Sequence, residues 1–260
     1  MKKQQVAAQL YTIRDYLQTP VEIAKSMKKI RDMGYKAVQV SGMGPIENAE
    51  LVKILDGEDL VCCATHEPGD MIINEPEKVV DKLKALNTKY TAFPHPGSFS
   101  IKTEDDVKKL AAQLNNSGQI LYENGLVLTY HNHDCEFAKV NGKLILDILY
   151  NETDPRYLQG EPDTFWVQSG GQDSAMWCEK LAGRLPLLHM KDYGVIPGGG
   201  RKFEEIGRGN LDWKGIIDAA EKASCEWFIV EQDGDWFDND PFKSLEISLQ
   251  YIEENLICTI

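Results

Sequence analysis

All five histidines of the chain lie at the ends of short apolar runs, where polar side chains can gather into one pocket. They are His66, His95, His131, His133 and His189. Asp163 and Glu231 end two further runs of the same kind. Imidazole nitrogens and carboxylate oxygens together suit a divalent ion of the Mn, Co, Zn or Mg type, and no thiolate stands among them. The pattern therefore predicts one divalent metal ion and hydrolytic or isomerising chemistry.

The elements that carry these residues alternate between strand and helix. Eight short runs rich in β-forming residues occupy 6–10, 37–40, 60–65, 90–94, 126–130, 157–162, 185–189 and 227–231. Helical periodicity fills 20–33, 74–86, 103–123, 173–181, 212–222 and 241–256. Eight strands, most of them followed by a helix, predict a (β/α)₈ TIM barrel, which often forms one domain of about 250 residues, here 1–260. The run 157–162 is the least regular strand, because Gln159, Gly160 and Glu161 interrupt its apolar character.

A barrel of this kind brings the carboxyl ends of its strands to one mouth, where enzymes of the fold have their active sites. We therefore expect the strand-end histidines and carboxylates to meet there. The competing architecture, an open doubly wound sheet, usually has a glycine-rich turn after its first strand, and residues 10–14 here are Leu-Tyr-Thr-Ile-Arg. The cluster Gly198–Gly200 opens no immediate helix, so it is interpreted as a flexible loop rather than a phosphate cradle.

Composition and charge limit the class of partner. The 28 basic and 41 acidic residues give a formal charge of −13, which disfavours nucleic acid and anionic lipid surfaces as partners. No apolar run reaches the roughly 20 residues needed to cross a bilayer, and no signal-like apolar core follows the first five residues. Six cysteines without CxxC spacing indicate reduced thiols and a cytoplasmic location. The oligomeric state stays open, a homo-oligomer included.

Five motifs give a more specific indication. They are QLYTIR at 9–14, YHNHDCEF at 130–137, DTFWVQSGG at 163–171, HMKD at 189–192 and GRGNLDW at 207–213. In this order and spacing the chain resembles the xylose-isomerase-like sugar phosphate isomerase/epimerase family, and the resemblance covers nearly all of it. The resemblance implies one divalent metal held by a Glu, Asp, His, Glu quartet at the ends of the last four strands.

Carried over residue by residue, Asp163, His189 and Glu231 match the last three ligands of that quartet. Many members place the first glutamate where this sequence has Thr129, and the spacing of the HNH and EF motifs suggests Glu136 instead. His131 or His133 could substitute for it. The resemblance makes Glu136 and Glu231 the catalytic acid/base pair. The remaining candidates are substrate-binding residues: His66, His95, His131, His133, Lys191 and Arg208.

Ordinary structural roles compete with several of these assignments. Asp163 could cap the segment that follows it, and Glu231 could be an ion-pair partner of Lys191. Asp212 would be an N-cap with Trp213 packed beneath the loop, and Trp166 could belong to the core rather than stack on a sugar.

The function expected first is a metal-dependent isomerase or epimerase that moves a proton next to a carbonyl of a small carbohydrate, through enediolate chemistry. A lyase or dehydratase on a keto-sugar, keto-glycoside or keto-inositol would use the same metal site. A third alternative is a sugar-binding barrel without catalysis, which the missing glutamate at Thr129 supports. A DNA-repair endonuclease of this superfold would need several metals and a basic groove, and the charge of −13 argues against it.

Overall fold

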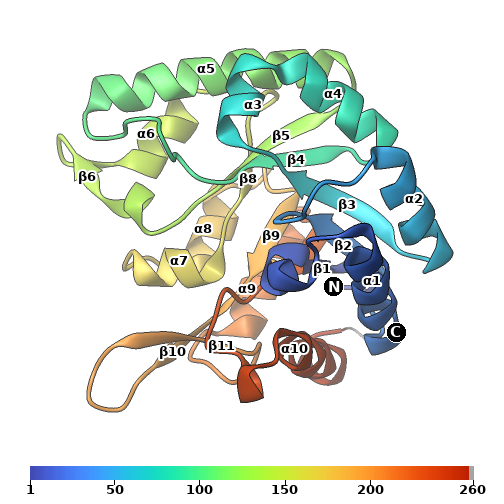
Figure 1. Ribbon diagram of the computed structural model, residues 1–260. Coiled ribbons are helices and arrows are strands. Elements are labelled where there is room, and N and C mark those ends of the chain that lie inside the picture. The colour runs from blue at the N-terminus through green and yellow to red at the C-terminus, as the bar shows by residue number, and fades with distance from the viewer. Residues whose placement is uncertain (258–260) are drawn as a thin grey trace.

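The computed structural model describes residues 1–257 and shows a parallel barrel. Its eight strands are β1 Val6–Gln9, β2 Ala37–Val40, β3 Val61–His66, β4 Tyr90–Phe93, β5 Val127–His131, β8 Gln159–Glu161, β9 Leu187–Met190 and β12 Trp227–Val230. They hydrogen-bond in the order β8-β5-β4-β3-β2-β1-β12-β9, all neighbours parallel (Figure 1). The predicted fold class is confirmed.

The barrel closes between β8 and β9 through a very short seam. Asp163 and His189 form an isolated parallel bridge, and the amide of His189 donates to the carbonyl of Pro162 at 3.0 Å. The two residues of this bridge are two of the sequence's candidate metal ligands. The seam therefore holds their backbones side by side at the barrel mouth.

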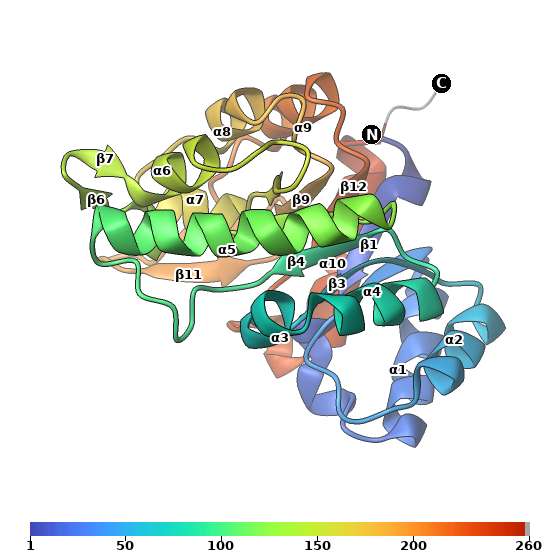
Figure 2. The ribbon, with the colours of Figure 1, turned by 90° about the horizontal axis from the view of Figure 1, so that it is seen from above.

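Helices surround the strands (Figures 1 and 2). They are α1 Pro20–Met33, α2 Asn48–Gly57, α3 Gly69–Asn74, α4 Pro76–Ala85, α5 Glu104–Glu123, α6 Ile145–Asn151, α7 Thr164–Ser169, α8 Ser174–Lys180, α9 Trp213–Lys222 and α10 Pro241–Asn255. In α1 the Thr19 hydroxyl accepts from the amide of Glu22, and Gly34 ends the helix at φ 112°. The segment expected at 74–86 begins instead with a new helix at Pro76, because a residue before proline is pushed out of the helical region and Glu75 has φ −139° and ψ 47°.

Two small antiparallel hairpins stand outside the barrel: β6 Lys139–Val140 with β7 Lys143–Leu144, and β10 Asp192–Val195 with β11 Arg201–Glu204. Short 3₁₀ segments span Lys3–Gln5, Leu10–Tyr16, Cys135–Phe137 and Phe237–Asn239. The cluster Gly198–Gly200 lies at the tip of the β10–β11 hairpin, with all three residues at positive φ. It therefore serves a tight turn.

The barrel interior is apolar near the amino ends of the strands. That layer contains Ala7, Ala37, Cys63, Ala64, Tyr90, Leu187 and Ile229. Towards the carboxyl ends it becomes a chain of fully buried polar side chains: Gln9, Gln39, Thr65, Thr91, Thr129, Glu161 and His189. Because buried polar groups need partners, this layer fixes the rotamers beneath the mouth.

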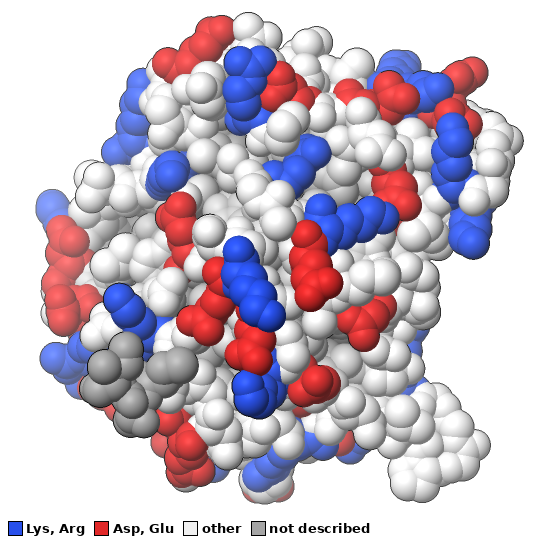
Figure 3. All heavy atoms as spheres, turned by 180° about the vertical axis from the view of Figure 1, so that it is seen from behind, with Lys and Arg blue, Asp and Glu red and all other residues white. Residues whose placement is uncertain are grey.

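Cys62 joins the core outside the barrel while Cys63 faces inward, as strand alternation predicts. The cysteines at 62, 63, 135, 178 and 225 are free thiols, and Cys258 lies outside the described residues. Within residues 1–257, no helix combines the length and the apolar character needed to cross a membrane. On the face in Figure 3, basic and acidic side chains are interspersed.

Candidate active site at the barrel mouth

A cavity of about 760 Å³ opens at the carboxyl ends of the strands. Six candidates from the sequence line it: His66, His95, His131, His133, Lys191 and Glu231. Around them lie Tyr11, Arg14, Val40, Ser41, Gly42, Met43, Glu67, Pro68, Met71, Lys82, Pro94, Trp166, Phe203 and Asp233. The volume is in the range of pockets that take small-molecule ligands.

Four buried side chains form what we call the outer cluster: His131 and Glu231, which line the cavity, with Asp163 and His189, which do not line it. His189 Nδ1 lies 2.9 Å from Glu231 Oε2 and 3.9 Å from Asp163 Oδ2. His131 Nε2 lies 3.9 Å from the same oxygen of Asp163. The four residues come from β5, the turn after β8, β9 and the end of β12, so the barrel geometry alone makes them converge.

Lys191 is the buried cation of this site. Its Nζ lies 2.9 Å from Asp163 Oδ2, 2.8 Å from Glu231 Oε2 and 2.8 Å from Asp233 Oδ2. Burial alone would lower the pKa of Lys191, but the three carboxylates outweigh it and raise that pKa well above its usual value. The same ammonium, with His189, holds the pKa of Glu231 well below its usual range despite burial. Lys191 and Glu231 are therefore charged together.

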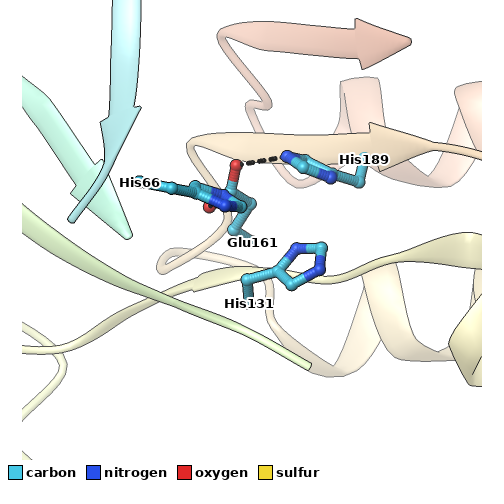
Figure 4. A group of neighbouring side chains, drawn as sticks. All are labelled: His66, His131, Glu161 and His189. Carbon is cyan, nitrogen blue, oxygen red and sulfur yellow. Dashed lines mark hydrogen bonds and ion pairs between the residues drawn. The ribbon is translucent and has the colours of Figure 1, made fainter. Parts of the chain in front are cut away.

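Behind the outer cluster lies an inner cluster: His66, His131, Glu161 and His189 (Figure 4). Glu161 is fully buried. Its Oε1 lies 2.7 Å from His189 Nε2, and its Oε2 lies 3.3 Å from both His66 Nε2 and the Thr129 hydroxyl. Burial would raise the pKa of Glu161, but His189 and His66 lower it to about 2. It is an ionised carboxylate under the cavity floor.

His189 thus stands between two carboxylate groups. Burial would lower its pKa, but Glu161 and Glu231 raise it to about 10. The pKa values of His131 and His133 shift in the other direction. Burial lowers the pKa of His131 well below its usual value and that of His133 to about 3. His95 and His133 meet edge to face, with ring centroids 4.8 Å apart. At neutral pH, the rings of His131 and His133 are therefore uncharged hydrogen-bonding groups.

Glu136 is not brought to either cluster and does not line the cavity. Its Oε1 accepts from the Tyr130 hydroxyl at 2.8 Å, and its Oε2 accepts from the amide of His133 at 2.9 Å. These bonds hold the 3₁₀ turn after β5 against the strand that precedes it. Glu136 therefore supports the loop that carries His133.

Arg208 likewise does not line the cavity. Its guanidinium lies 4.8 Å from the ring centroid of Phe237 and 3.5 Å from Glu205. The backbone of this loop is held by Asp192, whose carboxylate accepts from the amides of Gly207 and Gly209. The loop is thus directed towards Phe237 rather than the cavity.

The structural roles weighed from the sequence are also present. Asp163 Oδ1 accepts from the amide of Trp166 and caps α7, which leaves Oδ2 for the cluster. Asp212 caps α9, with Trp213 buried beneath it. Trp166 lines the cavity and packs on His133, with ring centroids 5.1 Å apart. Asp163 therefore caps α7 with Oδ1 and contributes Oδ2 to the site.

Reasoning from the sequence missed Glu161, Gln39 and Asp233. A signal existed for Glu161, because an acidic residue in a strand that must be buried on both faces needs a charged partner. Gln39 in β2 carried the same kind of signal. Asp233 follows Glu231 by two residues and binds Lys191, a contact that only the fold reveals.

The outer cluster fits a divalent metal ion. Its donors are two carboxylates and two imidazoles, a set that suits Zn and other first-row ions. Asp163 Oδ2 is buried, and within residues 1–257 its cationic contact is the Lys191 ammonium, with no further hydrogen-bond donor on it. His131 Nδ1 also has no hydrogen-bond partner among these residues. The Asp163 oxygen of the cluster thus has bonding capacity that is not filled.

A parallel eight-stranded barrel with carboxylate and imidazole side chains at its carboxyl end defines a (β/α)₈ protein with a candidate metal site. Residues 27–255 match the family described as xylose isomerase-like TIM barrel, and the chain belongs to that family. The resemblance expected from the five motifs is confirmed.

Inosose dehydratases of several bacteria are similar in sequence. The one from Geobacillus thermodenitrificans (strain NG80-2) is 27% identical over 167 residues, which are 58% of this chain and 55% of that protein. The one from Mesomycoplasma hyopneumoniae is 23% identical over 237 residues, 83% of this chain and 73% of that protein. A sugar phosphate isomerase/epimerase from Parabacteroides distasonis superposes with a TM-score of 0.84 at 22% identity, covering 98% of this chain and 96% of its own. The chain spans about half the length of the Geobacillus relative, and the structural likeness concerns the fold alone.

Proposed function

We propose that the protein is a metal-dependent lyase that removes water from a keto-polyol, a keto-inositol or keto-sugar. The observation that carries this proposal is the distribution of carboxylates at the cavity. Glu231 lines it, whereas Thr129 stands on β5 where family members place a second glutamate. Glu67 and Asp233 also line it, but Glu67 is paired with Lys82 and Asp233 with Lys191. Glu161 and Glu136 do not line it. One base on the Glu231 side suits elimination better than epimerisation, which needs proton transfer on two faces, and the sequence relatives named inosose dehydratases point the same way.

The residues that would hold the metal are Asp163, His189 and Glu231, with His131 as the fourth donor. In this arrangement His131 takes the place first expected for Glu136, an alternative that the HNH motif left open. A bound divalent ion would polarise the substrate carbonyl and acidify the adjacent C–H.

The chain's own residues supply the proton transfers. Glu231 is ionised and takes the proton from the carbon next to the carbonyl. The electron pair left on carbon expels the neighbouring hydroxyl as the C–O bond breaks. Lys191, protonated and 2.8 Å from Glu231 in the same cavity, gives the departing oxygen its proton, so that water leaves. His131 and His133 hydrogen-bond the remaining hydroxyl groups.

The charges at the cavity favour an uncharged substrate. Its cations are already engaged: Lys191 by three carboxylates, and Lys82 by buried Glu67 at 2.9 Å. Arg14 donates to the backbone carbonyls of Tyr11 and Asp233. A phosphate group would thus find no unpaired basic side chain among these three.

The test is incubation of the zinc- or manganese-loaded protein with a keto-inositol in D₂O. We expect loss of water, measured by mass and by the ultraviolet absorbance of the conjugated product, without deuterium in recovered substrate. The matched pair is Glu231→Gln and Glu226→Gln, since Glu226 is half-exposed at the opposite end of β12. Deuterium incorporation with recovery of an epimer or isomer would contradict elimination and support the isomerase or epimerase. No reaction with any keto-polyol, despite bound metal, would support a sugar-binding barrel.

A further inference from the structure

The ring of His189 presents its two nitrogens to two different groups of side chains. Nδ1 faces the outer cluster, 2.9 Å from Glu231 Oε2. Nε2 faces away from it, 2.7 Å from Glu161 Oε1 and 2.6 Å from Gln39 Oε1. The ring is fully buried, so both contacts persist without competition from solvent.

The neighbours of Nε2 fix which nitrogen carries a proton there. Gln39 Nε2 donates to Glu161 Oε1 at 2.6 Å, so the Gln39 oxygen is the atom turned towards His189. Gln9 Nε2 donates to that same oxygen at 2.8 Å, which confirms it as an acceptor. Nε2 therefore donates to Gln39 Oε1 and forms an ion pair with Glu161, so it carries an N–H. In the metal-free protein Nδ1 also donates, to Glu231 Oε2 at 2.9 Å. A metal ion that took Glu231 as a ligand would remove that acceptor and displace the proton of Nδ1, whereas Gln39 and Glu161 would keep the proton on Nε2.

Unfilled bonding capacity, rather than distance, separates the two clusters. Two donor atoms that each bind one ion at about 2.0–2.2 Å, with a donor–metal–donor angle of about 90–110°, lie roughly 2.8–3.6 Å from each other. The distance of 2.9 Å from His189 Nδ1 to Glu231 Oε2 lies within this range, that of 3.9 Å to Asp163 Oδ2 lies above it, and that of 2.7 Å from Nε2 to Glu161 lies at its lower edge. Both oxygens of Glu161 already have hydrogen-bond partners, whereas Asp163 Oδ2 has no hydrogen bond among residues 1–257 and lies 2.9 Å from the Lys191 ammonium, with His131 and His189 at 3.9 Å.

We propose that Glu161 is a positioning residue, which holds the Nε2–H tautomer and the orientation of His189 so that Nδ1 ligates the metal of the outer cluster. This inference rests on the metal site of the proposed function. Gln39 assists by accepting from the same N–H and by donating to Glu161. Partners of this kind behind a ligating imidazole contribute about 10–100-fold to metal affinity.

The first measurement is the zinc affinity of metal-free protein by calorimetry. Glu161→Gln should bind zinc about 10–100-fold more weakly than wild type, because the amide can turn its N–H towards Nε2 and favour the wrong tautomer. The matched control is Thr65→Val, which removes a fully buried hydroxyl of the same polar chain that bonds Thr91 and does not touch His189. It should bind zinc as wild type does.

The second measurement needs no variant and would not respond to a merely structural role. In ¹⁵N-histidine-labelled, zinc-loaded wild type, His189 should show a protonated Nε2 and a zinc-bound Nδ1; the five imidazoles are few enough to resolve, and His189→Gln assigns its signals. Wild-type zinc affinity in Glu161→Gln, or zinc on Nε2 of His189, would overturn the inference while leaving the proposed function standing. Failure of wild type to bind any divalent metal would overturn both.

Discussion

Removal of the buried ammonium should destabilise the metal-free protein strongly. Lys191 is 1% exposed and contacts Asp163, Glu231 and Asp233 at 2.8–2.9 Å. With an effective dielectric constant near 20, each contact corresponds to roughly 6 kcal/mol of Coulomb attraction, much of which the desolvation of the ammonium offsets. Lys191→Met keeps the volume and removes the ammonium from the buried carboxylates, of which Glu231 keeps His189 as a neighbour at 2.9 Å. Breaking a buried pair in this way costs about 3–5 kcal/mol.

The assay is urea unfolding in EDTA, followed by circular dichroism, with thermal unfolding as a second probe. Zinc should restore part of the lost stability of Lys191→Met, because Asp163 and Glu231 belong to the cluster that fits a divalent ion. The control is Lys28→Met, because its partner Asp32 is half-exposed on helix α1. This variant should change the free energy of unfolding very little. A loss below about 1 kcal/mol in Lys191→Met would refute the reasoning, since the buried carboxylates of Asp163 and Glu231 cannot lose this cation at so low a cost.

Three further predictions concern the outer cluster. His189→Ala should abolish tight zinc binding while the far-ultraviolet circular dichroism stays native; zinc at wild-type stoichiometry would exclude His189 as a ligand. Glu231→Gln should reduce turnover by about 10²–10⁴-fold, and turnover equal to that of Glu226→Gln would remove Glu231 from the reaction. In metal-free protein, burial raises the pKa of Asp163 from 3.8 to about 6. Its protonated form therefore stabilises the fold below about pH 4, and this contribution is lost as the pH rises through 6. The stability of wild type relative to Asp163→Asn should fall over that interval; a constant difference would contradict the raised pKa.

The strand ends could be predicted from the sequence because apolar runs and the residues that terminate them carry most of the information in a parallel barrel. The bridge between Asp163 and His189 confirms that these two residues meet. The run 157–162 looked irregular because β8 is only three residues long and Gly160 must approach the chain before β9, where its amide donates to the carbonyl of Arg184.

The parts that the sequence could not supply depend on side-chain direction. Glu136 follows its strand by five residues, and the intervening 3₁₀ turn directs its carboxylate to Tyr130 and the amide of His133. Nothing in the HNH and EF spacing specifies that turn. Glu161, in contrast, lies within a strand, and pleating alone directs it into the barrel towards His189.

The short seam between β8 and β9 should make the stability of the folded barrel depend on bound metal. Elsewhere the barrel strands pair over three residues or more, but here one bridge and the amides of Gly160 and His189 join the edges. Local opening begins where few backbone bonds must break, so the amide of His189 should exchange with solvent through a smaller opening than amides of β1 or β2. An ion bound to both Asp163 and His189 would connect the end of β8 to β9 and oppose the opening of this edge. Free metal at about 100 times its Kd would add roughly 2.7 kcal/mol to the free energy of unfolding. Loss of the metal would therefore lower the stability of the barrel as well as its activity.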